Sequence, residues 1–397
     1  MCIDYYDLTL LKEEVERIVG RKILTAADCN LLCNDIYLKT QSSTSLNTLR
    51  RLFDLMKSKY QPSLFTLDLL SKYCGYSSFS DFTNSKKNKP CNNENQDNSF
   101  VNFLVLLFRD FEVKSTNDIT YIQLIHKIIN NLEHWPAMID TFQREIAKTA
   151  SGQVFYYEQF INIDKLNSFY GKGLHYYLNE KKTVEAQLLG HSLLCLQSWL
   201  TMNDEGVENH YQEVLRHSVD ENIHPFISAR FFATQLYKCE ISSNETEAIL
   251  IQTREFYDNI RYSKFVHQNF PYFEYVLSEA LVLTNQYEEA LFYITEALKK
   301  RNYHVPPNVD LRLFESIYLF QAIALANIGK REKAKDILGS INTENFYFLS
   351  RHFNSILYLL QKGTFQKKEF LQKQVQYLVQ QTGFKKLVVK QEECFKI

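Results

Sequence analysis

Apolar residues along this chain recur at intervals of three or four positions, the spacing that places them on one face of an α-helix. The first example has Leu8, Leu11, Val15 and Ile18 on one face, and Gly20 follows where the helix is predicted to end. Similar helical patterns follow one another through the rest of the sequence. The pattern therefore predicts an all-α fold.

Polar residues that suit helix N-termini divide the first part of the chain into short helices. Side chains of Ser, Thr and Asp at these positions accept hydrogen bonds from backbone N–H groups that have no partner within the helix. The predicted starts lie at Thr25 with Asp28, at Ser45, at Pro62 with Ser63, and at Ser78 with Asp81. Together with the first helix, they predict a small domain of five short helices in residues 1–83.

A polar segment follows this domain. Residues 84–99, with the sequence NSKKNKPCNNENQDNS, contain six asparagines and no aliphatic or aromatic residue. Such a segment buries too little apolar surface to offset the entropy that is lost when it becomes ordered. It is predicted to be a linker between the first domain, residues 1–83, and a larger domain, residues 100–397.

The larger domain contains a repeated pair of helices. Each copy has two alanines ten residues apart, with a residue between them that suits a left-handed turn. The copies are Ala280, Asn285 and Ala290, and then Ala324, Gly329 and Ala334. Further first helices of such pairs are predicted to start near Val184, Pro225, Pro271, Leu311 and Phe346. Quasi-regular helical hairpins of this kind are typical of an α-solenoid.

These pairs resemble the tetratricopeptide repeat. The matching residues are Asn285, Tyr287, Ala290 and Ala297 in one copy, and Ala322, Gly329, Ala334 and Leu338 in the other, where Arg331 replaces the aromatic residue. The resemblance implies an inner groove that holds an extended peptide or protein partner. The groove residues that it implies are Tyr272, Tyr275, Glu279, Ser316 and Asn327. The alternative is that these side chains pack against the next helix pair.

The first domain resembles the helix-turn-helix module of Cro and repressor proteins. The resemblance rests on residues 44–53, TSLNTLRRLF, and residues 66–76, TLDLLSKYCGY, although the turn 39–44 has no glycine. It implies binding of double-stranded DNA. The contact residues that it implies are Ser45, Asn47, Thr48, Arg50 and Arg51. Residues 39–72 contain six basic and two acidic side chains, which favours a polyanion. The alternative is a structural module whose charges are only solvated.

Composition narrows the class of protein. The chain has 11 glycines and 7 prolines in 397 residues, whereas average usage is about 7% and 5%, so a doubly wound α/β enzyme is disfavoured. The net charge of −1 means that any attraction for DNA must be local. The eight cysteines form no Cys-x-x-Cys pair, and the apolar stretch 100–108 is too short for a membrane span. We expect a cytoplasmic protein with reduced thiols and no membrane segment.

Motifs for catalysis, cofactors and metals are not found in the sequence. Cys29 and Cys33 lie on one helix face, but no histidine accompanies them in residues 1–83, so core packing is favoured over zinc binding. Gly171-Lys172-Gly173 lacks the frame of a phosphate-binding loop. We therefore expect no enzyme activity, no cofactor and no metal. Two functions stay open: a DNA-binding regulator whose repeats bind a partner or form a homodimer, and a helical-repeat scaffold that does not bind DNA.

Overall fold

The computed structural model describes most of the chain. The described residues are 5–56, 62–88, 94–109, 119–132, 135–242, 245–260, 270–300, 313–366 and 369–389. They contain helices and connecting segments and no β-strand, which confirms the all-α fold class. The chain divides into two compact units, Met1–Gln96 (unit 1) and Asp97–Ile397 (unit 2).

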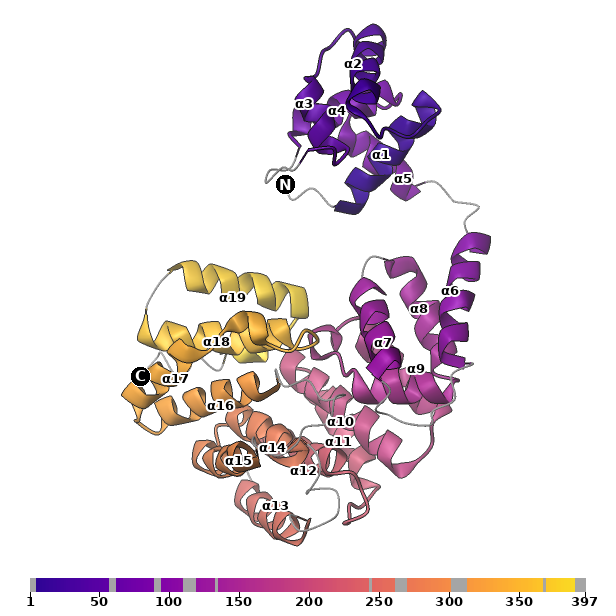
Figure 1. The fold of residues 1–397 in the computed structure, drawn as a ribbon. Coiled ribbons are helices and arrows are strands. Elements are labelled where there is room, and N and C mark those ends of the chain that lie inside the picture. The colour runs from indigo at the N-terminus through magenta and orange to yellow at the C-terminus, as the bar shows by residue number, and fades with distance from the viewer. Residues whose placement is uncertain are drawn as a thin grey trace. The chain divides into compact units, whose positions relative to one another are not determined.

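The described part of unit 1 up to residue 88 contains five short helices, drawn in indigo and purple in Figure 1. They are α1 (Tyr5–Val19), α2 (Ala26–Thr40), α3 (Leu46–Leu52), α4 (Leu64–Tyr73) and α5 (Phe79–Asn88). Their apolar faces meet in one core that includes Leu11, Val15, Leu49, Leu67 and Phe82. The number of helices and the inward residues of α1 agree with the predicted pattern.

The predicted helix caps are present. Asp28 N–H donates to Thr25 Oγ1 at 3.2 Å, and Thr25 N–H donates to Asp28 Oδ2 at 2.9 Å, which completes a capping box. Ser45 and Ser63 also accept hydrogen bonds from backbone N–H groups of α3 and α4. Gly20, with a φ of 76°, follows α1 as predicted. Each such cap typically stabilises a helix by about 1 kcal/mol.

The predicted linker is wrong in part. Helix α5 continues to Asn88, and α6 begins at Glu94, so much of segment 84–99 is helical. Residues 89–93 lie outside the described part of the chain. Lys, Glu and Gln are good helix formers even without apolar neighbours. Composition alone therefore overestimated the irregular structure of this segment.

Unit 2 begins with a group of helices that precede the repeats. They are α6 (Glu94–Arg109), whose first three residues still belong to unit 1, α7 (Ile119–Leu132), α8 (Pro136–Ile146), a π-helix (Gly152–Gln159), the short 3₁₀ helix η2 (Ile163–Lys165) and α9 (Phe169–Glu180). The aromatic run that follows α8 fills their core, since Phe155, Tyr156 and Tyr157 are all buried. Tyr170 and Tyr177 of α9 pack against the Tyr157 ring.

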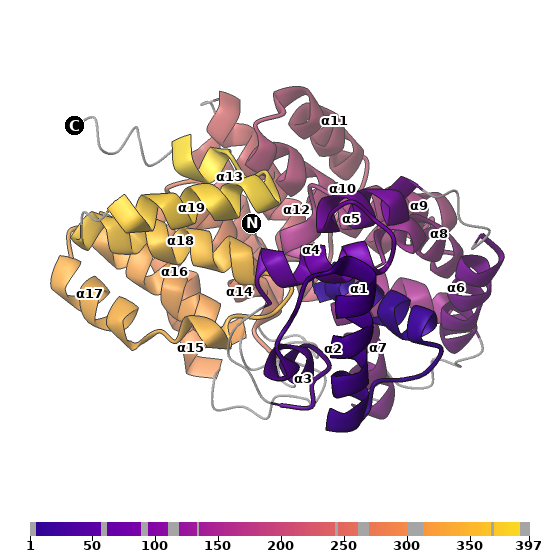
Figure 2. The ribbon, with the colours of Figure 1, turned by 90° about the horizontal axis from the view of Figure 1, so that it is seen from above.

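In the described residues, five helical hairpins follow. Their helices are α10 (Val184–Thr201) with α11 (Asp204–Leu215), α12 (Pro225–Ser242) with α13 (Thr246–Ile260), α14 (Tyr272–Leu283) with α15 (Tyr287–Lys299), α16 (Leu313–Asn327) with α17 (Arg331–Ser340), and α18 (Arg351–Phe365) with α19 (Glu369–Thr382). The first helix of each hairpin packs against the first helix of the next. Figure 1 shows the resulting curved array, and Figure 2 shows α16 to α19 side by side at its end.

Most predicted starts of the first helices agree with this arrangement. Helices α10, α12 and α14 begin at or next to the predicted positions. The predicted start near Leu311 lies outside the described residues. The start near Phe346 is wrong by five residues, because Phe346 belongs to the connection after the short 3₁₀ helix Thr343–Asn345, and α18 begins only at Arg351.

Small residues and left-handed turns shape the hairpins as the sequence predicts. Ala290, Ala322 and Ala334 are fully buried. Asn285 and Gly329 have φ values of 64° and 85° in the turns between paired helices. Because alanine places only a methyl group at the helix contact, the two helices of a pair approach closely, and the left-handed residue reverses the chain between them.

The last hairpin returns to the beginning of unit 2. The Asp164 carboxylate in η2 accepts hydrogen bonds from the backbone N–H groups of His352 and Phe353, at 2.8 and 2.9 Å. Asp164 N–H in turn donates to the Leu349 carbonyl at 3.0 Å. A buried carboxylate thus caps α18 from a segment far away in the sequence, which closes the array on itself.

No helix in the described part of the chain is both long and apolar enough to cross a lipid bilayer.

Candidate functional site

The short helix α3 and its N-cap residue Ser45 together carry all five residues for which DNA contact is predicted. Leu49 and Leu52 are buried and fix the helix on the core of unit 1. This leaves Asn47 and Arg51 exposed on the opposite side. Among the described residues, no side chain forms a hydrogen bond or ion pair with either of them. The two side chains are therefore available to a ligand.

The hydroxyls of Ser45 and Thr48 are used within the helix cap. Ser45 Oγ accepts a hydrogen bond from Thr48 N–H at 3.1 Å, and the two hydroxyl oxygens lie 2.8 Å apart. Ser45 is exposed and Thr48 is half-buried. Their first role is to stabilise the start of α3. A hydroxyl oxygen keeps further hydrogen-bonding capacity beyond the cap.

The two arginines of α3 differ in environment. Arg51 is exposed, whereas Arg50 is half-buried and its Nε atom is buried without a hydrogen-bond partner in the described residues. Asp54, which follows α3, forms an ion pair with Lys12 of α1 at 2.7 Å. Asp54 carries the acidic charge closest in sequence to the arginines, and its ion pair with Lys12 offsets that charge. Arg51 is the better placed of the two for an external anion.

The turn before α3 is formed without glycine. Gln41 adopts the left-handed conformation with a φ of 54°, and its N–H donates to the Tyr37 carbonyl at the end of α2. Thr40 Oγ1 then accepts a hydrogen bond from Ser42 N–H at 3.3 Å. Glutamine has no special preference for this conformation, so the left-handed turn could not be predicted from the residue type.

Other basic residues near α3 are engaged or lie elsewhere. Lys39 Nζ lies 3.6 Å from an Asp35 carboxylate oxygen and 4.4 Å from the centre of the Tyr73 ring. Lys72 is exposed on α4. Lys57 and Lys59 lie outside the described residues. Within the described residues, the local positive charge therefore rests chiefly on Arg51, Arg50 and Lys72.

Three of the five predicted groove residues do not line an open groove. Tyr275, Glu279 and Ser316 are buried, with exposed fractions of 7%, 2% and 0%. The physical reason is helix packing. Helix α14 packs against both α12 and α16, so that every residue from Phe273 to Leu283 is buried, and Ser316 lies on α16, which packs against α14, α15 and α17. The prediction took one face of these helices to be open, and helix packing covers it. The alternative of packing against the next pair holds for these three residues.

Glu279 has a structural partner instead of a ligand. Its carboxylate lies 3.0 Å from an Arg230 guanidinium nitrogen of α12, and both side chains are almost fully buried. Burial raises the pKa of the Glu279 carboxyl, and Arg230 opposes this shift. The ion pair joins two neighbouring first helices inside unit 2. The pair was not predicted, because the two residues are far apart in the sequence.

The remaining two predicted groove residues are accessible. Asn327 is exposed at the end of α16, and its side-chain amide donates to the Ile323 carbonyl at 2.9 Å. Tyr272 is half-buried at the start of α14. It lines a small hollow between the beginnings of α12 and α14, with a cavity volume of about 10 Å³, roughly the space that one water molecule needs.

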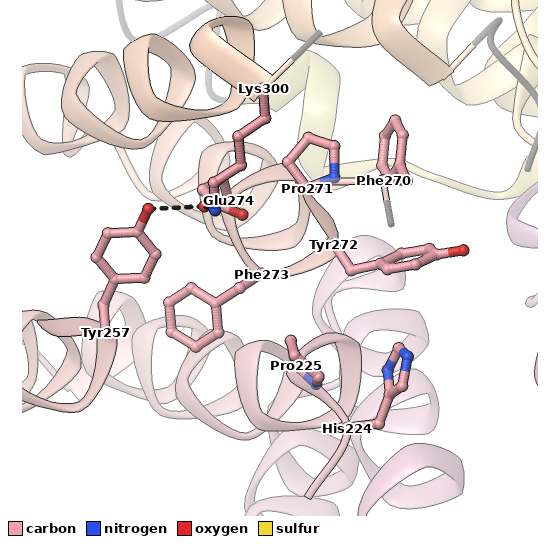
Figure 3. A pocket seen from close by; sticks show the side chains of 9 residues that line it. All are labelled: His224, Pro225, Tyr257, Phe270, Pro271, Tyr272, Phe273, Glu274 and Lys300. Carbon is pink, nitrogen blue, oxygen red and sulfur yellow. Dashed lines mark hydrogen bonds and ion pairs between the residues drawn. The ribbon is translucent and has the colours of Figure 1, made fainter. Parts of the chain in front are cut away.

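This hollow has aromatic walls and one buried ion pair, as Figure 3 shows. Its lining consists of His224, Pro225, Tyr257, Phe270, Pro271, Tyr272, Phe273, Glu274 and Lys300. The Tyr257 hydroxyl donates to the Glu274 carboxylate at 2.6 Å, and Lys300 forms an ion pair with the same group. Burial lowers the pKa of His224. Because Glu274 is already engaged, the hollow offers mainly apolar contact.

Comparisons with protein-family models, with curated proteins and with solved structures found no match for this chain. Among the described residues, no group of three or more His, Cys, Asp and Glu side chains could hold a metal ion.

Proposed function

We propose that this protein is a regulator in which unit 1 binds double-stranded DNA through α3, and the hairpins of unit 2 bind a peptide or protein partner. The observation that carries the proposal is the exposed pair Asn47 and Arg51 on a short helix. Buried leucines hold the opposite face of that helix in the core.

The chemistry of these side chains suits nucleic acid. Arginine pairs with guanine edges or with phosphates, and asparagine pairs with adenine edges. Ser45 and Thr48 add hydroxyls at the start of the same helix, and Arg50 adds a half-buried charge. Since the whole chain has a net charge of −1, attraction to DNA would come from this local surface and not from a general basic field.

For unit 2, the proposal concerns the accessible residues only. Tyr272, beside the aromatic hollow, would pack against an apolar side chain of the partner, and Asn327 would form a hydrogen bond to the partner's backbone. A tyrosine offers apolar area with a polar tip, which suits such a site. The buried residues Tyr275, Glu279 and Ser316 have no part in it.

The second candidate function is a scaffold that does not bind DNA. The engagement of Lys39 with Asp35 and Tyr73 favours it, because that lysine is less available to phosphates. In this case the charges of α3 would be only solvated, and unit 2 alone would bind partners.

A salt-titrated DNA-binding assay on the full chain separates the two functions. We expect binding to duplex DNA at low salt. Arg51→Ala should weaken it and lower the log–log salt slope by about one if the arginine contacts a phosphate. If the arginine reads a base, the loss should be about 1–3 kcal/mol at one sequence position.

The matched control is Lys335→Ala, which removes one exposed positive charge from α17 in unit 2. It should leave DNA binding unchanged. Absence of binding by the wild-type chain at low salt, or an equal loss in both variants, would refute the DNA-binding proposal and favour the scaffold.

A further inference from the structure

Three histidines lie on consecutive helices of unit 2. His175 lies on α9, His191 on α10 and His210 on α11, while the chain has ten histidines in all. The closest contact joins Nδ1 of His191 and Nδ1 of His210, which lie 3.2 Å apart. The centres of these two rings are 5.4 Å apart, and His175 lies 6.4 Å from His210 by the same measure.

A separation of 3.2 Å between two imidazole nitrogens has two physical explanations. One ring can donate an N–H to the other, or both can direct lone pairs at one shared cation. Two nitrogen ligands of a tetrahedral zinc ion lie about 3.3 Å apart, because each is roughly 2.0–2.1 Å from the metal. The observed 3.2 Å separation fits this geometry.

The surroundings of the pair leave access for an ion and for water. Both rings are half-buried, and His175 beside them is exposed. Burial is the main cause that lowers the pKa of His191 and of His210 to about 4, so both are neutral near pH 7, the form that binds metals.

The charged groups near the histidine pair include both cations and an anion. Lys182, Arg216 and His217 lie close enough to His191 to disfavour added positive charge, whereas Glu213 near His210 favours it. Arg216 is itself paired with Glu213 at 2.7 Å, which moderates the effect of both. The described residues place no third ligand in coordinating position, so water would complete the shell.

We propose that Nδ1 of His191 and Nδ1 of His210 together bind one divalent transition-metal ion of the zinc type. Imidazole nitrogen is a preferred ligand of zinc, nickel and copper, and water is a common ligand at open zinc positions. The ion would link α10 to α11 and so stabilise the first hairpin of the array. This inference is independent of the DNA-binding proposal.

Titration calorimetry with ZnCl₂ tests the site on the full chain after treatment with EDTA and dialysis. We expect one zinc ion per chain in the wild type. His191→Ala and His210→Ala should each weaken the binding by about tenfold or more, because removing a ligand costs at least as much as removing its outer-shell support. The control His352→Ala, at the distant start of α18, should bind zinc as the wild type does.

Thermal unfolding supplies a second readout that does not depend on calorimetric heats. Zinc should raise the melting temperature of the wild type and of His352→Ala, since a ligand that binds only the folded state stabilises it. It should not raise that of His191→Ala or His210→Ala, whose folding is checked by circular dichroism. If wild type and His191→Ala bind zinc equally, or if the wild type binds none, the pair is an N–H···N hydrogen bond and the proposal is wrong.

Discussion

The two units of this protein differ in which side chains they leave exposed and which they bury. Unit 1 leaves large apolar side chains exposed on α2 and α4, among them Leu31 at 54%, Leu38 at 71% and Phe65 at 67%. Unit 2 also exposes some apolar side chains, such as Phe370 at 66%, but in addition it encloses the Arg230–Glu279 ion pair, whose side chains are both almost fully buried. A small unit has a high ratio of surface to volume and cannot cover all its apolar residues, whereas a large one can enclose even polar groups.

The closed form of unit 2 explains how polar residues come to be buried there. Each first helix lies between two others, and the last hairpin returns to η2 through Asp164. Lys386, which follows α19, also contacts Glu240 of α12 at 3.2 Å. An array that closes in this way covers faces that would stay open in a straight one. Its interior polar groups must then find partners among themselves.

The buried ion pair provides the largest test of this difference. Glu279→Ala should lower the free energy of unfolding of unit 2 by about 3–5 kcal/mol, because it leaves the Arg230 charge buried without its partner. Both tryptophans, Trp135 and Trp199, belong to unit 2, so urea unfolding followed by tryptophan fluorescence reports on this unit.

The double variant Arg230→Met with Glu279→Leu is the matched control for that change. It replaces both charges by apolar groups, and most of the lost stability should return. If the single and the double variant are equally destabilised, the loss comes from disturbed packing and not from an unpaired charge.

A smaller loss of stability is expected when the N-terminal cap of α2 in unit 1 is removed. Thr25→Ala should destabilise this unit by about 1 kcal/mol, because the N–H of Asp28 loses its acceptor. Circular dichroism should show the change, while the tryptophan transition of unit 2 stays where it is in the wild type. A shift of the tryptophan transition would show that the units do not unfold independently.

The smallest effect on stability is expected from protonation of Asp28 at low pH. The hydrogen bond from the Thr25 hydroxyl and those from backbone N–H groups lower the pKa of Asp28, although desolvation acts against them. A carboxylate with a lowered pKa stabilises the folded state above its ordinary pKa of about 3.9, and this stabilisation is lost as the pH falls further. The difference in melting temperature between wild type and Asp28→Asn should therefore be present at pH 6 and shrink below pH 4. A constant difference would contradict a role for the ionised carboxylate.

Much of the fold was determined by local sequence. The caps at Thr25, Ser45 and Ser63 and the left-handed residues Asn285 and Gly329 act within a few positions of the backbone that they shape. Buried Ala290 and Ala334 follow from the same local pattern. These features depend on hydrogen bonds and steric limits inside one segment, which is why the sequence alone predicts them.

Tertiary structure decided which helix faces are open and which distant groups meet. The sequence placed Tyr275 and Glu279 on one face of a helix, but only the packing of α14 between two neighbours determined that this face is buried. The cap of α18 by Asp164 and the contact of His191 with His210 likewise join separate segments. Such contacts depend on how helices pack in three dimensions, and helical periodicity fixes only which residues share a face, not what that face will meet.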